Sequence, residues 1–185
     1  CIDDRYYAAR SWALANEIDS ASVQLFYFAS HLYTTENFLH FSVNYFLQIP
    51  EILLKATVLN SLHGDKRWDE FLDTLKDNRN KAKARLDMEL VAILDTIYRI
   101  DQTIRDPIDS IAKAYGWESE ELKEYEKFMH KKDSINLITV ESILAEHGWL
   151  GAEVLGYEGN LTLWLVIQHS DLDTQEKYLP MMREA

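Results

Sequence analysis

The hydrophobic residues of this chain recur every three or four positions along most of its length, which predicts helices. In the segment 86–104 the apolar positions are spaced by 4, 3, 4, 3 and 4 residues: Leu86, Leu90, Ile93, Ile97, Ile100 and Ile104. This spacing places one apolar stripe on a helix, which we expect to pack against another helix. Val, Ile and Thr never alternate with polar residues over the length of a strand, so the sequence predicts an all-α fold.

A helical hairpin is expected at the N-terminal end. The segments 6–15 and 20–30 have helical periodicity and are joined by four polar residues. Asp19 or Ser20 is expected to cap the second helix by accepting hydrogen bonds from its first backbone N–H groups.

Proline and glycine set the expected boundaries further along. Pro50 is expected to end one helix and begin the next, and Pro180 to kink or end the last helix early. Four of the six glycines lie in 148–159, which predicts the one true loop of the chain there. The segment 161–169 is apolar all round, so we expect it to be the central buried helix.

Composition and charge narrow the classes of function. The 185 residues are 47% hydrophobic, which is enough to bury a core, and their net charge of −12 argues against nucleic acid or an anionic membrane as the main partner. No uncharged stretch is long enough for a membrane span, and no signal peptide is visible. The single cysteine, Cys1, excludes an internal disulfide and a Cys-based zinc site.

The strongest candidate for chemistry is Gln168-His169-Ser170-Asp171. His169 lies where an apolar helix meets a polar turn, and it could act as a general base or a metal ligand with Asp171 orienting it. The structural alternative is that His169 is a cation at a helix C-terminus and that Asp171 caps the next helix.

A second candidate group is Asp101, Gln102 and Arg105. Asp101 and Arg105 are four residues apart, the spacing of an ordinary helical ion pair. They interrupt an apolar stripe, however, and polar groups beside a core need partners. They therefore belong either to a buried structural network or to a site.

No motif for a metal or a cofactor is present. The sequence has no H-E-x-x-H, no nucleophile elbow, no phosphate-cradling glycine loop and no dinucleotide fingerprint. A set of acidic residues and histidines near the glycines has no ligand spacing, so no metal and no cofactor are predicted. The members of that set are Glu146, His147, Glu153, Glu158 and His169.

Five segments carry a resemblance to a known family. They are IYRIDQTIR at 97–105, KDSINLI at 132–138, EHGWLG at 146–151, LVIQHSD at 165–171 and QEKYLPMMR at 175–183. In this order they resemble an uncharacterised family of helical bacterial domains that is frequent in Bacteroidota. Upstream, residues 4–21 are similar to the tetratricopeptide-like repeat that often precedes that domain.

The resemblance implies a tetratricopeptide-like helical region at 1–60 and an uncharacterised α-helical bundle domain at 61–185. It implies export from the cytoplasm in many relatives and no established activity. Relatives extend beyond both ends, so the chain is expected to be trimmed there. The polar positions that match the family motifs are Asp101, Gln102, Arg105, Gln168, His169 and Asp171.

Three functions remain open from the sequence. The first is a scaffold in which the helical hairpin packs on the bundle and binds a protein or peptide, with Gln102, Arg105, Gln168 and His169 as candidate binding residues. The second is a hydrolase-like enzyme that uses His169 with Asp171 or Asp101. The third is an acidic immunity or inhibitor protein that masks a basic partner. A pocket that brings the Asp101–Arg105 turn within hydrogen-bond reach of His169 would favour the enzyme, and a solvent-facing His169 more than about 10 Å away would dismiss it.

Overall fold

The computed structural model describes residues 2–34 and 43–184, and all regular secondary structure in these ranges is helical. The prediction of an all-α fold is confirmed. Contacts divide the chain into an N-terminal unit, Cys1–Leu86, and a C-terminal unit, Asp87–Ala185. This division falls later than the boundary expected after residue 60, because the helix that follows residue 65 packs on the N-terminal hairpin.

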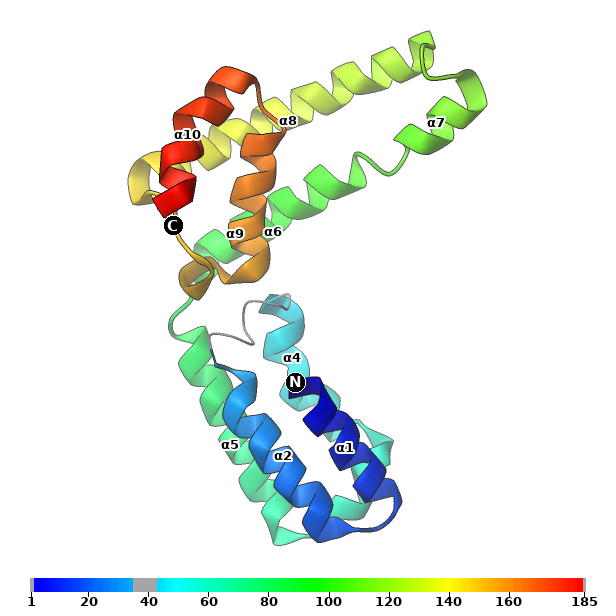
Figure 1. Ribbon diagram of the computed structural model, residues 1–185, viewed down its shortest axis with the longest axis vertical. Helices are drawn as coiled ribbons and strands as arrows, with labels where there is room; N and C mark the ends of the chain where they lie inside the picture. The colour runs from blue at the N-terminus through cyan, green and yellow to red at the C-terminus, as the bar shows by residue number, and fades with distance from the viewer. Residues whose placement is uncertain (1, 35–42, 185) are drawn as a thin grey trace. The chain divides into compact units, whose positions relative to one another are not determined.

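The N-terminal unit is built on the predicted hairpin (Figure 1). Its helices are α1 (Ile2–Leu14), α2 (Ile18–Leu32), α4 (Val43–Leu54), the short 3-10 helix η1 (Thr57–Leu62) and α5 (Lys66–Lys83). The turn between α1 and α2 contains Asn16 with φ of 60°, a left-handed conformation that asparagine tolerates. The expected cap is wrong: α2 begins at Ile18, and its N-cap residue, Glu17, makes no side-chain cap bond.

Pro50 lies inside α4, so the prediction that it ends a helix is wrong. A proline has no N–H to donate to the carbonyl four residues earlier, which here belongs to Phe46. The hydroxyl of Tyr33 donates to this Phe46 carbonyl at 3.1 Å, and the two rings pack edge to face. The helix therefore continues past the proline because a tyrosine from outside the helix supplies a hydrogen bond. Burial raises the pKa of Tyr33 well above its ordinary value.

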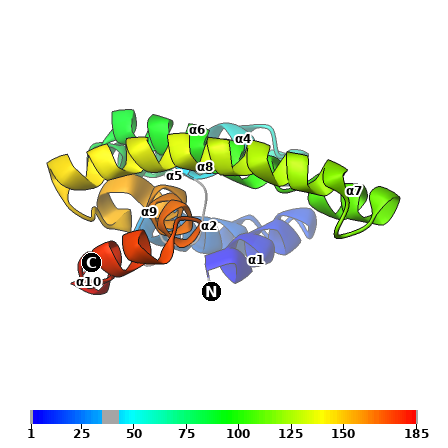
Figure 2. The ribbon, with the colours of Figure 1, turned by 90° about the horizontal axis from the view of Figure 1, so that it is seen from above.

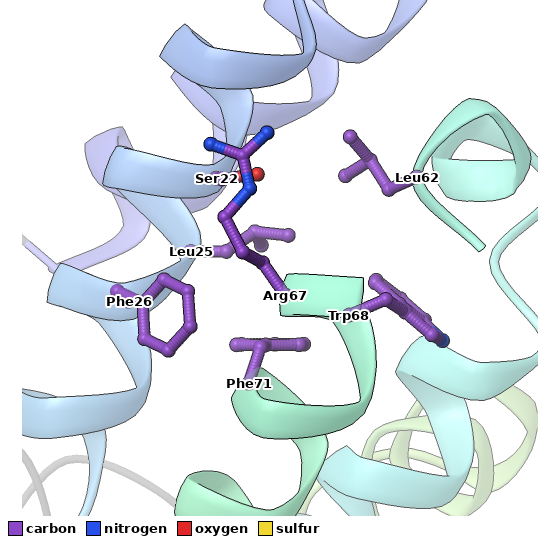
Figure 3. Close-up of a pocket in the computed structure, with 7 residues that line it drawn as sticks. All are labelled: Ser22, Leu25, Phe26, Leu62, Arg67, Trp68 and Phe71. Atoms are coloured by element: carbon purple, nitrogen blue, oxygen red, sulfur yellow. The ribbon is translucent and has the colours of Figure 1, made fainter. Parts of the chain in front are cut away.

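Helices α2 and α5 enclose a small cavity in the N-terminal unit. Its volume is about 10 Å³, close to the least space that holds one water molecule. Figure 3 shows Arg67 reaching from the start of α5 across this cavity towards α2. The guanidinium of Arg67 binds the carboxylates of Asp65, which caps α5, and of Asp19 on α2. The lining residues are Ser22, Leu25, Phe26, Leu62, Arg67, Trp68 and Phe71.

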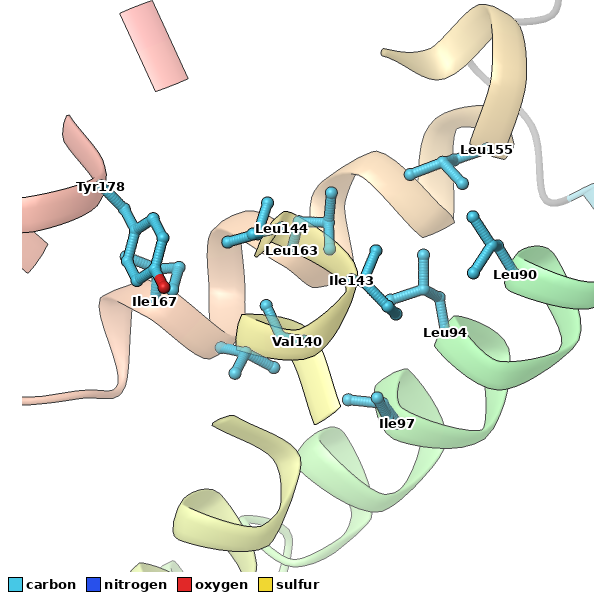
Figure 4. Packing of buried hydrophobic residues seen from close by; sticks show 11 residues of the cluster. Leu90, Leu94, Ile97, Val140, Ile143, Leu144, Leu155, Leu163, Ile167 and Tyr178 are labelled. Carbon is cyan, nitrogen blue, oxygen red and sulfur yellow. The ribbon is translucent and has the colours of Figure 1, made fainter. Parts of the chain in front are cut away.

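The C-terminal unit consists of five helices. They are α6 (Met88–Thr103), α7 (Ile108–Tyr115), α8 (Glu120–His147), α9 (Ala152–Gln168) and α10 (Leu172–Glu184). The long helix α8 lies beside α6, as Figures 1 and 2 both show, and α9 packs against α6 and α8. The core lies where these three helices meet, with Tyr178 of α10 at its edge (Figure 4).

One side chain in the buried stripe of α6 is charged. The residues of this helix and its C-cap that face inward are Leu90, Leu94, Ile97, Asp101 and Ile104, at spacings of 4, 3, 4 and 3. The sequence stripe included Ile93, which is instead 37% exposed. The predicted helix packing is confirmed, and the carboxylate of Asp101 occupies a position that the spacing would give to an aliphatic residue.

Three expectations for the last third of the chain are corrected by the structure, one wholly and two in part. Residues 148–159 are not one loop, because α9 already begins at Ala152 and bends at Gly156, whose φ is 70°. The segment 161–169 forms the end of α9, which packs against α6, α8 and α10 as expected of a central helix, but its Trp164 is 39% exposed. Pro180 does not end α10, which continues to Glu184.

Within the described residues, no helix is long and apolar enough to cross a membrane.

Candidate functional site

Asp101 is the residue around which the candidate site is arranged. Its side chain is 1% exposed and lies on the inward face of α6. A carboxylate in such a position is destabilised unless several donors bind it. Asp101 has three side-chain donors, each from a different residue.

The first donor is His169, which the turn after α9 brings to α6 from 68 residues away. The imidazole Nδ1 lies 2.9 Å from Oδ1 of Asp101. His169 is the C-cap residue of α9, and its side chain is 24% exposed. The sequence placed these two residues in separate candidate groups, and the structure joins them.

Asp171 does not orient His169 through any hydrogen bond of the structure. Its carboxylate accepts a hydrogen bond of 2.8 Å from the backbone N–H of Thr174 and so caps α10. This bond holds the pKa of Asp171 below its ordinary value. The structural alternative for Asp171 is therefore confirmed.

The second donor is Arg105, one turn after Asp101 on α6. Its Nη1 lies 3.2 Å from Asp101 Oδ1 and 2.6 Å from the Asp101 carbonyl oxygen. Its Nη2 lies 3.0 Å from Oδ1 of Asp133 on α8. The predicted ion pair between Asp101 and Arg105 is confirmed, and the guanidinium joins two carboxylates on neighbouring helices.

The third donor is Gln102, whose Nε2 donates to Oδ2 of Asp101 at 2.8 Å. Gln168, the remaining residue named with His169, is exposed, and only its backbone carbonyl takes part in a hydrogen bond, with Gln175. The structure thus brings together Asp101, Gln102, Arg105 and His169, and leaves Gln168 outside this group.

The electrostatic balance at Asp101 favours the ionised carboxylate. Burial by itself opposes ionisation. The hydrogen bond and charge of His169, the charge of Arg105 and the hydrogen bond from Gln102 outweigh it, so the pKa of Asp101 lies below its ordinary value. Asp101 is therefore a fixed negative charge at neutral pH, placed against one nitrogen of the imidazole.

Two members of this region were missed as site residues in the sequence. Asp133 was considered only as part of a segment that resembles a family motif, yet it binds Arg105. Asn136, one turn later on α8, is 5% exposed, and no described residue accepts a hydrogen bond from its Nδ2. Neither residue had a distinctive signal in the sequence, because Asp133 is flanked by Lys132 and Ser134 and Asn136 is a single amide between Ile135 and Leu137.

A metal ion is poorly suited to this arrangement. Ligand atoms of Asp101, Asp133 and His169 lie within 4.8 Å of one another, the only such group in the described part of the chain. The guanidinium of Arg105, however, already binds both carboxylates. A divalent cation would have to displace it or lie beside it, and like charges at that distance repel. The five residues considered from the sequence as a metal set do not come together as one group.

The arrangement can hold and move a proton. An imidazole whose Nδ1–H donates to a buried carboxylate is fixed in one tautomer and one orientation, and its Nε2 carries the free lone pair. None of the described residues forms a hydrogen bond with Nε2 of His169. This nitrogen can therefore accept a proton from a bound molecule.

A scan against protein-family models, a search of curated proteins and a search of solved structures each found no match to this chain.

Proposed function

We propose that the C-terminal unit is a hydrolase-like enzyme in which His169 is the general base and Asp101 is its positioning residue. The observation that supports this most directly is the distance of 2.9 Å between Nδ1 of His169 and Oδ1 of the buried Asp101. A general base needs such a positioning partner within hydrogen-bond reach, so this distance supports the enzyme.

The surrounding charges support the same role. Arg105 and Gln102 bind the atoms of the Asp101 carboxylate and fix its direction. The carboxylate then stabilises the imidazolium that forms when Nε2 takes a proton. His169 is partly exposed whereas Asp101 is not, so the proton-accepting side of the pair is the one that a substrate can reach.

The proposal can be tested without knowing the substrate, because diethyl pyrocarbonate acylates the unprotonated nitrogen of accessible histidines. We expect His169 to react, and Asp101→Asn to slow this reaction several-fold, because the amide no longer fixes the tautomer that leaves Nε2 unprotonated. The modification rate at each histidine is followed by peptide mass spectrometry.

His130 on α8 is the matched control, because its side chain is exposed and no ion pair or hydrogen bond of its ring is found in the described residues. Its modification rate should be the same in both proteins. An unreactive His169, or an equal rate for His169 in the Asp101→Asn variant, would contradict the assignment of the general base.

A second candidate function concerns the N-terminal unit, which we propose is a tetratricopeptide-like module that binds a protein or peptide. The supporting observation is that the α1–α2 hairpin exposes large apolar side chains. These are Tyr7, Trp12, Leu14, Val23 and Tyr27, each at least 42% exposed. Apolar side chains gathered on a surface are typical of interaction sites.

The test of this second function is capture of a partner from cells of the source by the full chain. A Tyr7→Ser, Leu14→Ser variant with unchanged helix content should capture less partner if the hairpin surface binds it. A complex that instead forms only with a basic protein and dissociates in salt would support the third interpretation, an acidic inhibitor.

Membership in the uncharacterised bacterial family of helical domains is likewise a proposal, supported by the order of the five segments that carry the resemblance. Each of them contains a residue of the Asp101 network or of the core of the C-terminal unit: Arg105, Asp133, Trp149, His169 and Tyr178.

A further inference from the structure

Asn136 has a buried side-chain nitrogen with no hydrogen-bond partner. The residue is 5% exposed, and its Nδ2 is the one buried side-chain polar atom in the described chain without a partner. Leaving a buried donor unpaired is destabilising, and native structures do so rarely. By contrast, the buried hydroxyl of Thr162 donates to the carbonyl of Glu158 in its own helix.

Asn136 lies on the face of α8 that meets α6. It follows Asp133 by three residues and precedes Val140 by four, so the three side chains share one face of the helix. Asp133 pairs with a residue of the α6 C-terminus, and Val140 lies in the core cluster (Figure 4).

The facing positions on α6 place Asn136 beside the candidate site. Asp133 pairs with Arg105, and Val140 lies in the same cluster as Ile97. Asp101 lies four residues after Ile97 and four before Arg105, which follows the C-cap of α6. Because α6 and α8 run in opposite directions (Figure 1), a register with these two pairs level sets Asn136 at the height of Asp101.

The charges of the site select the kind of acceptor that a ligand would bring. Asp101 and Asp133 carry two negative charges and Arg105 one positive charge, which leaves one net negative charge when His169 is neutral. An anionic ligand is repelled by this charge. A cation cannot accept the N–H of an amide. The ligand group that fits both conditions is an uncharged carbonyl oxygen.

We propose that Asn136 binds the carbonyl oxygen of a neutral acyl substrate, an amide or an ester, next to His169. This inference rests on the proposed function and adds its substrate class. The amide of Asn136 donates through Nδ2–H, and that hydrogen bond strengthens as negative charge develops on the oxygen during attack by a nucleophile. The donor is left unpaired in the free protein because its partner belongs to the substrate.

N-Methylacetamide is the probe for this site, since it is a small uncharged molecule with an amide carbonyl. In ¹⁵N-labelled full-length protein, we expect its addition to shift the side-chain NH₂ signals of Asn136 in a saturable way. The exposed Asn80 on α5 is the matched control, and its side-chain signals should not saturate. Inorganic phosphate, the anionic probe, should leave the Asn136 signals in place.

The Asn136→Leu variant separates a ligand donor from a structural one. Leucine branches at Cγ as asparagine does and has no polar atom. The substitution removes an unpaired donor and should therefore raise the melting temperature by about 2–4 °C. In the unchanged protein, N-methylacetamide bound next to His169 should also shift the ring signals of His169. The Asn136→Leu variant should lose this shift. The control Thr162→Val removes a buried hydroxyl that has a partner, and should leave the probe response intact.

Two results would overturn the inference. One is an Asn136 signal that does not respond to N-methylacetamide, which is the behaviour expected if the amide only binds a resident water. The other is a lower melting temperature for Asn136→Leu, which would show that the amide is structural. Neither result changes the diethyl pyrocarbonate reaction of His169, so failure here is distinguishable from failure of the general base.

Discussion

The two units of this protein differ in how deeply their paired charged side chains are buried. In the N-terminal unit the ion pairs of the described residues lie near helix ends and none has a buried member, as in the pair of Arg79 with Glu51. In the C-terminal unit a carboxylate with 1% exposure, Asp101, stands in the row of core side chains on α6. Replacement of a buried ionic group by apolar residues is often neutral or stabilising. Stability alone therefore does not account for the retained charge, and this agrees with the role proposed for Asp101 beside His169.

The largest difference between the units should appear when one partner of an ion pair is removed. Asp101→Ala leaves Nδ1 of His169 without its acceptor and takes one carboxylate from the guanidinium of Arg105, and we expect the C-terminal unit to lose about 3–5 kcal/mol in the free energy of unfolding. Urea denaturation followed by circular dichroism measures this loss.

The matched change in the N-terminal unit is Glu51→Ala, which removes the acceptor of Arg79. The loss there should be below about 1 kcal/mol, because an exposed pair is screened by water. Equal losses in the two variants would remove the contrast between the units.

Core packing, unlike charge, should behave alike in both units. Leu94 on α6 and Leu75 on α5 are each fully buried. We expect Leu94→Ala and Leu75→Ala each to cost about 2–5 kcal/mol, through lost burial and the cavity left behind. Thermal unfolding of the two variants measures both losses. A much larger loss in one variant would show that the two cores are not packed alike and would contradict this expectation.

Acid should weaken the C-terminal unit through Asp101. The pKa of this carboxyl is lower in the folded chain than its unfolded value of about 3.9. The unfolded state therefore binds a proton first, and the stabilisation is complete above that value and is lost as the pH falls through the folded pKa. We expect the free energy of unfolding of Asp101→Asn to depend less on pH below about 4 than that of the unchanged chain. Parallel pH curves for the two proteins would contradict this.

The smallest effect concerns the tyrosine that binds the carbonyl before Pro50. Tyr33→Phe removes a hydrogen bond to the buried Phe46 carbonyl and should cost about 1 kcal/mol. Tyr178→Phe in the C-terminal unit removes a hydroxyl that binds the partly exposed Glu141, and should cost less. Chemical denaturation resolves the order of the two, and the reverse order would show that burial does not govern these bonds.

Local patterns predicted the helices, and long-range contacts account for the features that were missed. The spacing of apolar residues in 86–104 was sufficient to predict α6 and its packing. Pro50 and Pro180 were misread because a proline removes one backbone donor without always ending the helix. For Pro50, Tyr33 supplies that hydrogen bond from 17 residues away in the sequence.

The candidate site was predicted residue by residue but not as a group. Asp101, Arg105 and His169 were singled out because polar side chains next to apolar stripes need partners. The sequence could not show that the partner of His169 is Asp101 rather than Asp171, because this depends on the path of α9 back to α6. Asn136 escaped notice because a single amide within a helix has no distinctive pattern.

The bend at Gly156 divides α9 into a part whose length is free to vary and a part whose length is fixed. Because the bend breaks the helical winding, a residue gained or lost before it need not rotate the C-terminal part of the helix. Between Gly156 and His169 the winding is continuous, and each inserted or deleted residue turns the imidazole by about 100° around the axis. The segment 157–168 thus sets the angular position of His169, and insertions there would carry the imidazole away from α6.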